Sequence, residues 1–203
     1  MGGSGSKIIL PEPTGKYSVG CGDVMTAGSP FEGGSFFRMF YPIDPCDLKQ
    51  RQVQLASWLP RQEYHDGYAD FLSISHRLRP FLGYIFALGG ASIPALWHAP
   101  LIHRPGSPKF PLVIFSHGLG GCRTTYSTVC AEIASHGFVV ASVEHRDHSA
   151  CLSYYYRMAN DSGKIPSTPV QSPELDELDC VWIKYKDYGH KRDPEEQKIR
   201  NNQ

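Results

Sequence analysis

The sequence predicts an α/β fold in which helices flank a parallel-type sheet. The clearest evidence is two apolar runs, PLVIF at 111–115 and FVVASV at 138–143, which are typical of strands buried on both faces of such a sheet. Between the runs, apolar residues recur at helical spacing, and Gly137 can end that helix. A strand, a helix and a second strand in this order make a right-handed βαβ unit. The predicted helical face consists of Tyr126, Val129, Cys130 and Ile133.

The elements before this unit are predicted in chain order. Irregular coil is expected over 11–23, and the aromatic stretch GSFFRMFYP at 34–42 predicts a strand that ends at a proline. A polar loop over 43–56 precedes a helix within 60–79, where apolar residues recur at near-helical spacing. Residues 81–102 predict a short helix followed by coil, because glycine and proline interrupt their apolar pattern.

Composition and charge exclude several classes of protein. The 20 basic and 20 acidic residues cancel, and no basic run is interleaved with aromatics, so no nucleic-acid partner is expected. The six cysteines form no C-x-x-C pair and are expected to be reduced thiols in a cytosolic protein. No secretory signal is expected, because the first twenty residues contain no apolar core, and the longest apolar run, 81–88, is too short to cross a bilayer. Nothing in the sequence predicts a cofactor or a metal.

The turn SHGLGGCR at 116–123 is the first stretch that points to chemistry. It follows one predicted strand and precedes the predicted helix, which is where serine esterases place one backbone donor of the oxyanion hole. Glycines let the backbone approach a substrate closely, so Leu119 and Gly120 can direct their amides at a developing negative charge. The alternative is a tight strand-to-helix turn without chemistry.

No serine of the chain lies in the G-x-S-x-G elbow that carries the nucleophile of such enzymes. Ser116 is adjacent to His117, but neighbouring residues on a strand point to opposite faces, so this pair is not expected to share a proton. We therefore expect the nucleophile to lie outside this sequence.

Residues 144–149, EHRDHS, follow the second apolar run and allow three interpretations. A kinase catalytic loop is excluded because its leucine, its asparagine and a phosphate-binding loop are missing. A metal pair of His145 and His148 lacks a third ligand at a recognisable spacing. The remaining interpretation is a charge cluster that braces the strand end, with Glu144, Arg146 and Asp147 pairing locally.

The first six residues, MGGSGS, fit the M-G-x-x-x-[ST] pattern for myristoylation of Gly2. The alternative is a flexible leader that is merely rich in glycine and serine. One acyl chain binds a membrane only marginally, so a second contact would be needed, and the apolar run 81–88 could supply it if it is exposed.

The chain resembles the platelet-activating factor acetylhydrolase family, in particular its intracellular, myristoylated type. The resemblance rests on 19–25, 34–42 and 58–64, and above all on PLVIFSHGLGGCRTTYS and on 134–156. It implies the N-terminal half of an α/β-hydrolase fold and a Ser-His-Asp triad that needs no calcium. It also implies an oxyanion donor at the Leu119 amide. Relatives read GLGA where this chain has Gly121, a change that is expected to loosen the turn.

The resemblance also implies a division of the chain and a function. We expect a flexible leader over 1–18, a partial hydrolase domain over 19–156, and a polar loop with a charged tail over 157–203, which continues into a missing half. The implied function is hydrolysis of short or oxidised sn-2 acyl groups of phospholipids, by a protein that is cytoplasmic and partly bound to the membrane surface.

Alternatives to that function stay open. They are a non-catalytic lipid-anchored protein and a carboxylesterase half with another acyl substrate. This chain alone is expected to be inactive. Without the strand that leads to the nucleophile, one edge of the strand at 111–115 should be bare and prone to aggregation.

Overall fold

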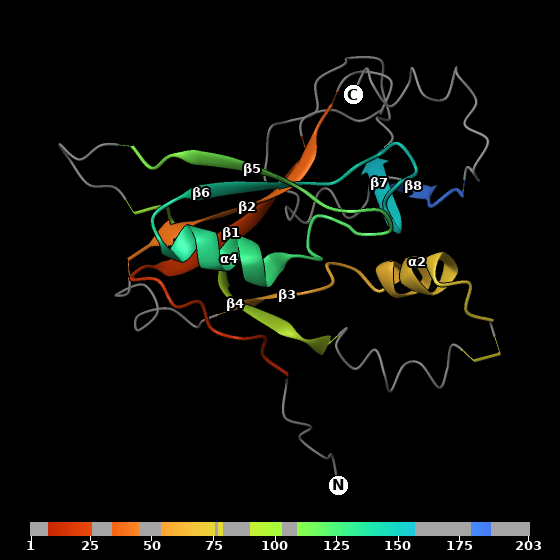
Figure 1. Ribbon diagram of the computed structural model, residues 1–203, viewed down its shortest axis with the longest axis horizontal. Helices are drawn as coiled ribbons and strands as arrows, with labels where there is room; N and C mark the ends of the chain where they lie inside the picture. Colours follow the sequence, from red (N-terminus) through yellow and green to blue (C-terminus); the bar gives the residue numbers. More distant parts are fainter. Residues whose placement is uncertain are drawn as a thin grey trace, which may run out of the picture.

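The computed structural model describes residues 8–25, 34–44, 54–75, 77–78, 90–102, 109–156 and 180–187. Within these ranges, six strands form one mixed sheet in the order β3-β4-β1-β2-β6-β5, and two further strands form a separate pair, β7-β8 (Figure 1). The first sheet contains β1 (Ser18–Met25), β2 (Phe36–Ile43), β3 (Leu55–Ser57), β4 (Ser92–Trp97), β5 (Leu112–Ser116) and β6 (Val139–Val143). The second contains β7 (Leu152–Tyr156) and β8 (Cys180–Lys184), beside helix α2 (Glu63–Phe71).

The βαβ unit and the α/β class are confirmed. β5 and β6 pair in parallel, and helix α4 (Ser127–Ser135) connects them. The helix lies across one face of the sheet and contacts β1, β2, β4 and β6 (Figure 1). The predicted face of the helix was partly wrong, because Tyr126 and Val129 are 40% and 46% exposed. The helix instead buries small residues, which let it pack close to the sheet: Ser127, Cys130, Ala131, Ala134 and Ser135.

Strands β1 and β4 were missed in stretches predicted as coil, and β3 was missed at the end of the predicted polar loop over 43–56. β1 is buried along most of its length, and its Gly20 is needed because a Cβ there would lie 2.7 Å from side-chain atoms of Tyr41 and Ile43. β4 contains Pro94 at the point where its register against β3 is irregular. A proline is tolerated there because the ladder is already interrupted. The strand predicted over 34–42 is confirmed as β2, although it continues through Pro42 to Ile43 and does not end at the proline, and the helix within 60–79 is the shorter α2.

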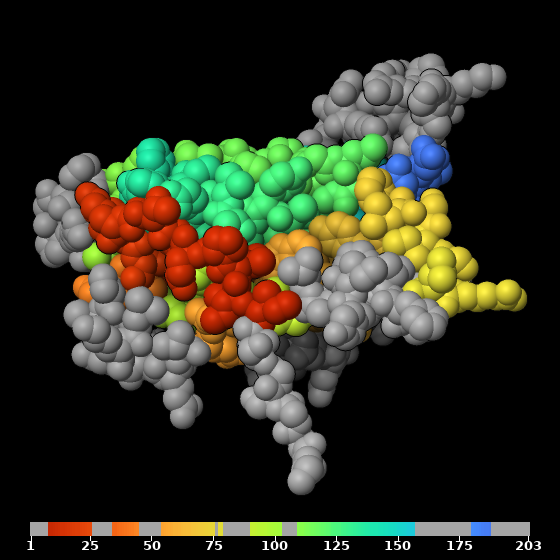
Figure 2. Space-filling view, turned by 60° about the horizontal axis from the view of Figure 1, so that its bottom comes forward, coloured from red at the N-terminus to blue at the C-terminus, as the bar shows by residue number. Residues whose placement is uncertain are grey.

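Residues 8–18, predicted as part of a flexible leader, are bonded to the fold. The backbone of Ile8 and Leu10 exchanges hydrogen bonds with Ser92, and the Tyr17 N–H donates to the Ser135 carbonyl at 3.0 Å. In Figure 2 this N-terminal segment, in red, runs beside the green-blue surface of α4. Gly2 and residues 81–88 lie outside the described residues. β8 lies within the stretch that was predicted as loop and tail.

β5 is not buried on both faces as predicted. Val113 and Phe115 are half-buried and pack on the core beneath α4, whereas Leu112 and Ile114 on the other face are 61% and 71% exposed. β5 is also the last strand of its sheet among those described. No helix of the described chain has the length and apolar character needed to cross a membrane.

Candidate active site

The glycine turn joins the carboxyl end of β5 to α4, at the edge where α/β sheets place functional loops. Gly120 has φ +72°, and a Cβ on it would lie 2.2 Å from the ring of Phe71. Both the backbone conformation and the space therefore require glycine at this position.

The two amides of the turn that were predicted as donors differ in their partners. The Gly120 N–H donates to the Ser149 carbonyl at 2.8 Å, so it is engaged within the protein. The hydrogen bonds among the described residues do not include the Leu119 N–H, and the Leu119 side chain is 63% exposed. Leu119 is thus an exposed residue of the turn whose N–H has no partner among the described hydrogen bonds.

The direction of the Leu119 N–H is fixed through the carbonyl of the same peptide unit. The Gly118 carbonyl accepts the Gly121 N–H at 3.0 Å and lies 2.8 Å from His117 Nδ1. Because a trans peptide is planar, holding this carbonyl inward turns the Leu119 N–H the opposite way. The turn therefore presents a preorganised donor.

His117 acts here as a neutral ring with its proton on Nδ1. Its Nε2 accepts the backbone N–H of His145 at 3.2 Å, so Nδ1 is left to donate to the Gly118 carbonyl. Burial lowers the pKa of His117, which favours this neutral form.

Ser116 pairs with a histidine, but not with the neighbour considered in the sequence. Its Oγ lies 2.8 Å from Nε2 of His145, which follows β6. The parallel register explains the pairing, because Ser116 stands opposite Val143, two residues before His145. Sequence reasoning could have found this contact from the register of the βαβ unit.

A buried ionic network lies beneath the turn. Arg123 donates from Nη1 to Glu144 at 2.6 Å and from Nη2 to Asp23 at 2.7 Å, and Asp23 also accepts Nε of Arg38 at 2.6 Å. The Tyr64 hydroxyl donates to Glu144 at 2.6 Å. Burial opposes the charge on Asp23, but the two arginines outweigh it and hold its pKa far below the ordinary value.

The stretch at 144–149 braces the strand end, in part through residues outside the stretch. Glu144 binds Arg123, which lies in the turn before α4, and Asp147 accepts the Ser149 N–H at 2.9 Å. His148 Nδ1 lies 2.8 Å from the Lys184 carbonyl. In the part of the chain that is described, no three side chains that ligate metals converge.

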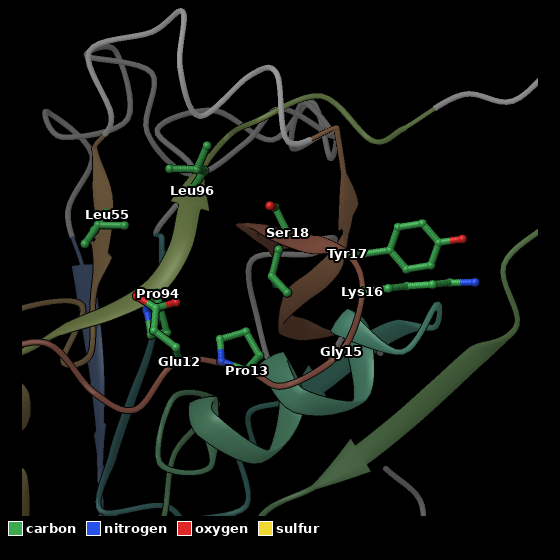
Figure 3. Close-up of a pocket in the computed structure, with 10 residues that line it drawn as sticks. Glu12, Pro13, Gly15, Lys16, Tyr17, Ser18, Leu55, Pro94 and Leu96 are labelled. Carbon is green, nitrogen blue, oxygen red and sulfur yellow. The ribbon is translucent and has the colours of Figure 1, made fainter.

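A pocket of about 300 Å³ lies away from the turn. It is lined by the N-terminal segment and by strands β1, β3 and β4, and Figure 3 shows Lys16 and Tyr17 on one side and Leu55, Pro94 and Leu96 on the other. No residue of the glycine turn lines it, so it does not serve the Leu119 amide.

Comparison with known proteins places this chain in a family. The family model described as platelet-activating factor acetylhydrolase, isoform II, matches residues 2–203. The platelet-activating factor acetylhydrolases of Cavia porcellus and Gallus gallus are 38% and 39% identical to the chain over 87% and 91% of its length. The chain spans only 35% and 40% of these two relatives.

Two further similarities are more limited. A putative phospholipase A2 of Schizosaccharomyces pombe is 41% identical over 57% of the chain, which covers 25% of that protein. Among solved structures, a ferulic acid esterase from Streptomyces cinnamoneus matches with a TM-score of 0.47 and 21% identity, over 79% of this chain and 41% of the esterase.

Proposed function

Because the chain belongs to the platelet-activating factor acetylhydrolase, isoform II, family, we propose that its protein is a calcium-independent serine esterase acting on phospholipids. Its substrates are 1-alkyl-2-acetylglycerophosphocholine and phospholipids with short or oxidised sn-2 acyl groups. The observation that supports this most directly is the Leu119 N–H, which has no partner among the hydrogen bonds of the described residues and whose direction the Gly118 carbonyl fixes.

In this proposal residues 116–121 supply one half of the oxyanion hole. A serine outside residues 1–203 attacks the acyl carbonyl, and the carbonyl oxygen becomes an oxyanion that accepts the Leu119 N–H. One such donor contributes roughly 3 kcal/mol to the transition state. The Gly120 amide, which donates to Ser149, holds the turn in place and does not meet the oxyanion.

The test compares two changes at one residue in a protein extended to the length of its relatives. Leu119→Pro removes the N–H, and we expect kcat to fall by about 100-fold or more with little change in KM. Leu119→Ala keeps the N–H and serves as the matched control, since Leu119 is exposed. Equal rates for both variants, with unchanged circular dichroism, would remove Leu119 from the oxyanion hole.

A second assay asks whether residues 1–203 hydrolyse acetyl esters on their own. We expect near-background turnover, because the triad nucleophile is absent and only weak catalysis remains without it. Ser116→Ala is the control, since Ser116 contacts His145. Turnover at an ordinary esterase rate that Ser116→Ala abolishes would place a nucleophile within this chain. Comparing acetyl esters with longer and aromatic acyl esters distinguishes a different acyl preference.

We also propose that the protein is cytoplasmic and partly membrane-associated through a myristoyl group on Gly2, with no nucleic-acid partner. The support is the M-G-x-x-x-[ST] pattern and the zero net charge. Co-expression with a myristoyltransferase should add one acyl chain and shift part of the protein to anionic vesicles. Gly2→Ala should abolish both effects, and vesicle binding that persists in this variant would exclude Gly2 as the anchor.

A further inference from the structure

Two cysteine thiols meet directly beneath the glycine turn. Cys122 is the first residue after the turn, and Cys151 immediately precedes β7. The Cys151 N–H donates to the Gly121 carbonyl at 3.0 Å, and the two thiols are hydrogen-bonded to each other. Both residues belong to one buried cluster, with exposed fractions of 0% and 1%.

The surroundings of the Cys122 sulfur consist of hydroxyl groups. Thr124 Oγ1 lies 3.3 Å from it, Thr125 Oγ1 3.5 Å and the Tyr68 hydroxyl 3.7 Å. Thr125 donates to this sulfur and lies 2.6 Å from the Tyr68 hydroxyl, so Thr124, Thr125 and the Cys151 thiol are the three groups that can donate to the sulfur. Hydrogen bonds of this kind stabilise a negatively charged acceptor more than a neutral one.

The two thiols consequently differ in acidity. Burial disfavours the charge on Cys122, but the hydrogen bonds from Cys151, Thr124 and Thr125 outweigh it and lower the pKa of Cys122 below its ordinary value. The hydrogen bond to Cys122, and burial, raise the pKa of Cys151. Burial has the opposite net effect elsewhere, because it raises the pKa of Cys21 to about 12 and that of Cys130 to about 11.

We propose that Cys122 and Cys151 form a redox modification site, which a peroxide oxidises to a disulfide that ties the glycine turn to the segment before β7. The oxidant must be small and uncharged, because both thiols are buried, and hydrogen peroxide meets both conditions. The proposal does not depend on the proposed esterase activity.

The chemistry takes two balanced steps. The Cys122 thiolate attacks one peroxide oxygen, the O–O bond breaks, and the departing hydroxide takes a proton to become water, which leaves a sulfenic acid. The Cys151 thiol then attacks the sulfenic sulfur, the S–O bond breaks, and the hydroxide leaves with the Cys151 proton as a second water. Two thiols and one peroxide thus give one disulfide and two waters.

The backbone is already placed for this bond. A disulfide requires Cα atoms roughly 4.4–6.8 Å apart. A direct hydrogen bond of 3.0 Å joins the Cys151 N–H to the peptide between Gly121 and Cys122, so the two backbone segments are in contact at this point. Closing the bond then needs side-chain rotation and a small approach of the two segments.

Peptide mapping tests the site. Trypsin places Cys122, Cys130 and Cys151 in three separate peptides, 110–123, 124–146 and 147–157. After treatment of residues 1–203 with hydrogen peroxide and blocking of free thiols, we expect peptides 110–123 and 147–157 to appear linked, with the loss of two hydrogens. A reductant should separate them again.

Two variants sharpen the assignment. Cys130→Ala should leave the linked pair unchanged, whereas Cys151→Ala should abolish it and leave Cys122 as sulfenic or sulfinic acid. Because the mapping of the unsubstituted chain is itself decisive, the proposal stays testable even if Cys151→Ala fails to fold. A different first disulfide, or blocked thiols at both positions after peroxide treatment, would overturn it.

Discussion

The turn at the carboxyl end of β5 is held by many hydrogen bonds, whereas the outer face of the strand is exposed. At its carboxyl end, hydrogen bonds from His117 and Gly121 to the Gly118 carbonyl, and from Gly120 to the Ser149 carbonyl, fix the turn, and the ionic network of Arg123 lies beneath it. Along its outer face, Leu112 and Ile114 are exposed, and no described strand pairs with its free edge. The difference indicates that the Leu119 donor is held from the interior of this chain and not by whatever covers β5. Substitutions in the buried network should therefore strongly lower the stability of the protein, whereas substitutions on the exposed face of β5 should change it little.

The largest effect is expected for Arg123→Met, which removes the interior support. The substitution leaves Asp23 and Glu144 buried without their shared cation, and removing one partner of a buried ion pair costs about 3–5 kcal/mol. Urea unfolding should show this loss in the free energy of unfolding. Arg77→Met, at an exposed arginine, is the matched control and should change stability by less than about 0.5 kcal/mol. Similar midpoints for the two variants would contradict the central role of the network.

The second effect concerns the backbone of the turn. Gly120→Ala introduces a Cβ at φ +72° within 2.2 Å of the Phe71 ring, so strain and overlap together should cost about 2 kcal/mol. Gly90→Ala is the control, because nothing lies within 4 Å of its added Cβ. The double variant Gly120→Ala/Phe71→Ala separates the two causes in thermal unfolding. If the double variant recovers full stability, the positive φ at position 120 contributes nothing to the loss of stability in Gly120→Ala.

The sequence predicted the βαβ unit and the turn well because their signals are local. An apolar run, a glycine turn and a second apolar run leave few alternative structures, and both strands and the helix lie where they were expected. β1 and β4 escaped prediction because their glycines and proline are tolerated only through contacts with other strands, such as the fit of Gly20 against Tyr41. Those contacts join residues that are distant in the sequence.

The same division applies to the candidate site. Leu119 was identified from the H-G-x-G pattern, and its role as a donor stays a prediction. That Gly120 donates to Ser149 could not be read from the turn alone, because the acceptor comes from the loop after β6. Arg123, Asp23 and Tyr64 gave no local signal, since buried charges are defined by partners far along the chain.

The third effect links the turn to pH. His117→Asn keeps a donor near the Gly118 carbonyl but loses the Nε2 acceptor for the His145 N–H, and one such bond contributes about 1 kcal/mol. In the folded state, burial lowers the pKa of His117 below its ordinary value of 6.5. The unfolded chain therefore binds a proton at this histidine first as the pH falls. The stability from neutral His117 is therefore full above pH 6.5 and is lost below it.

The measurement is the difference in unfolding free energy between the chain and His117→Asn at several pH values. We expect about 1 kcal/mol at pH 8, decreasing toward pH 5. Glu144, Asp147 and His145 face the ring, and they are present in both proteins. The lowered pKa values of His65 and His98 act in the same direction and cancel in the difference. A difference that does not depend on pH would show that His117 keeps one protonation state throughout.

The smallest change in stability is expected on the outer face of β5. Ile114 is 71% exposed, so Ile114→Lys should alter the free energy of unfolding by less than about 0.5 kcal/mol. It should nevertheless lower self-association, because a charge on an exposed strand edge opposes pairing between chains. Val113→Lys, one residue away, should instead destabilise the protein, because Val113 packs on the core beneath α4. Sedimentation velocity measures self-association, and urea unfolding measures the loss of stability.

If Ile114→Lys were as destabilising as Val113→Lys, the outer face of β5 would be covered, and the strand would be supported from both sides.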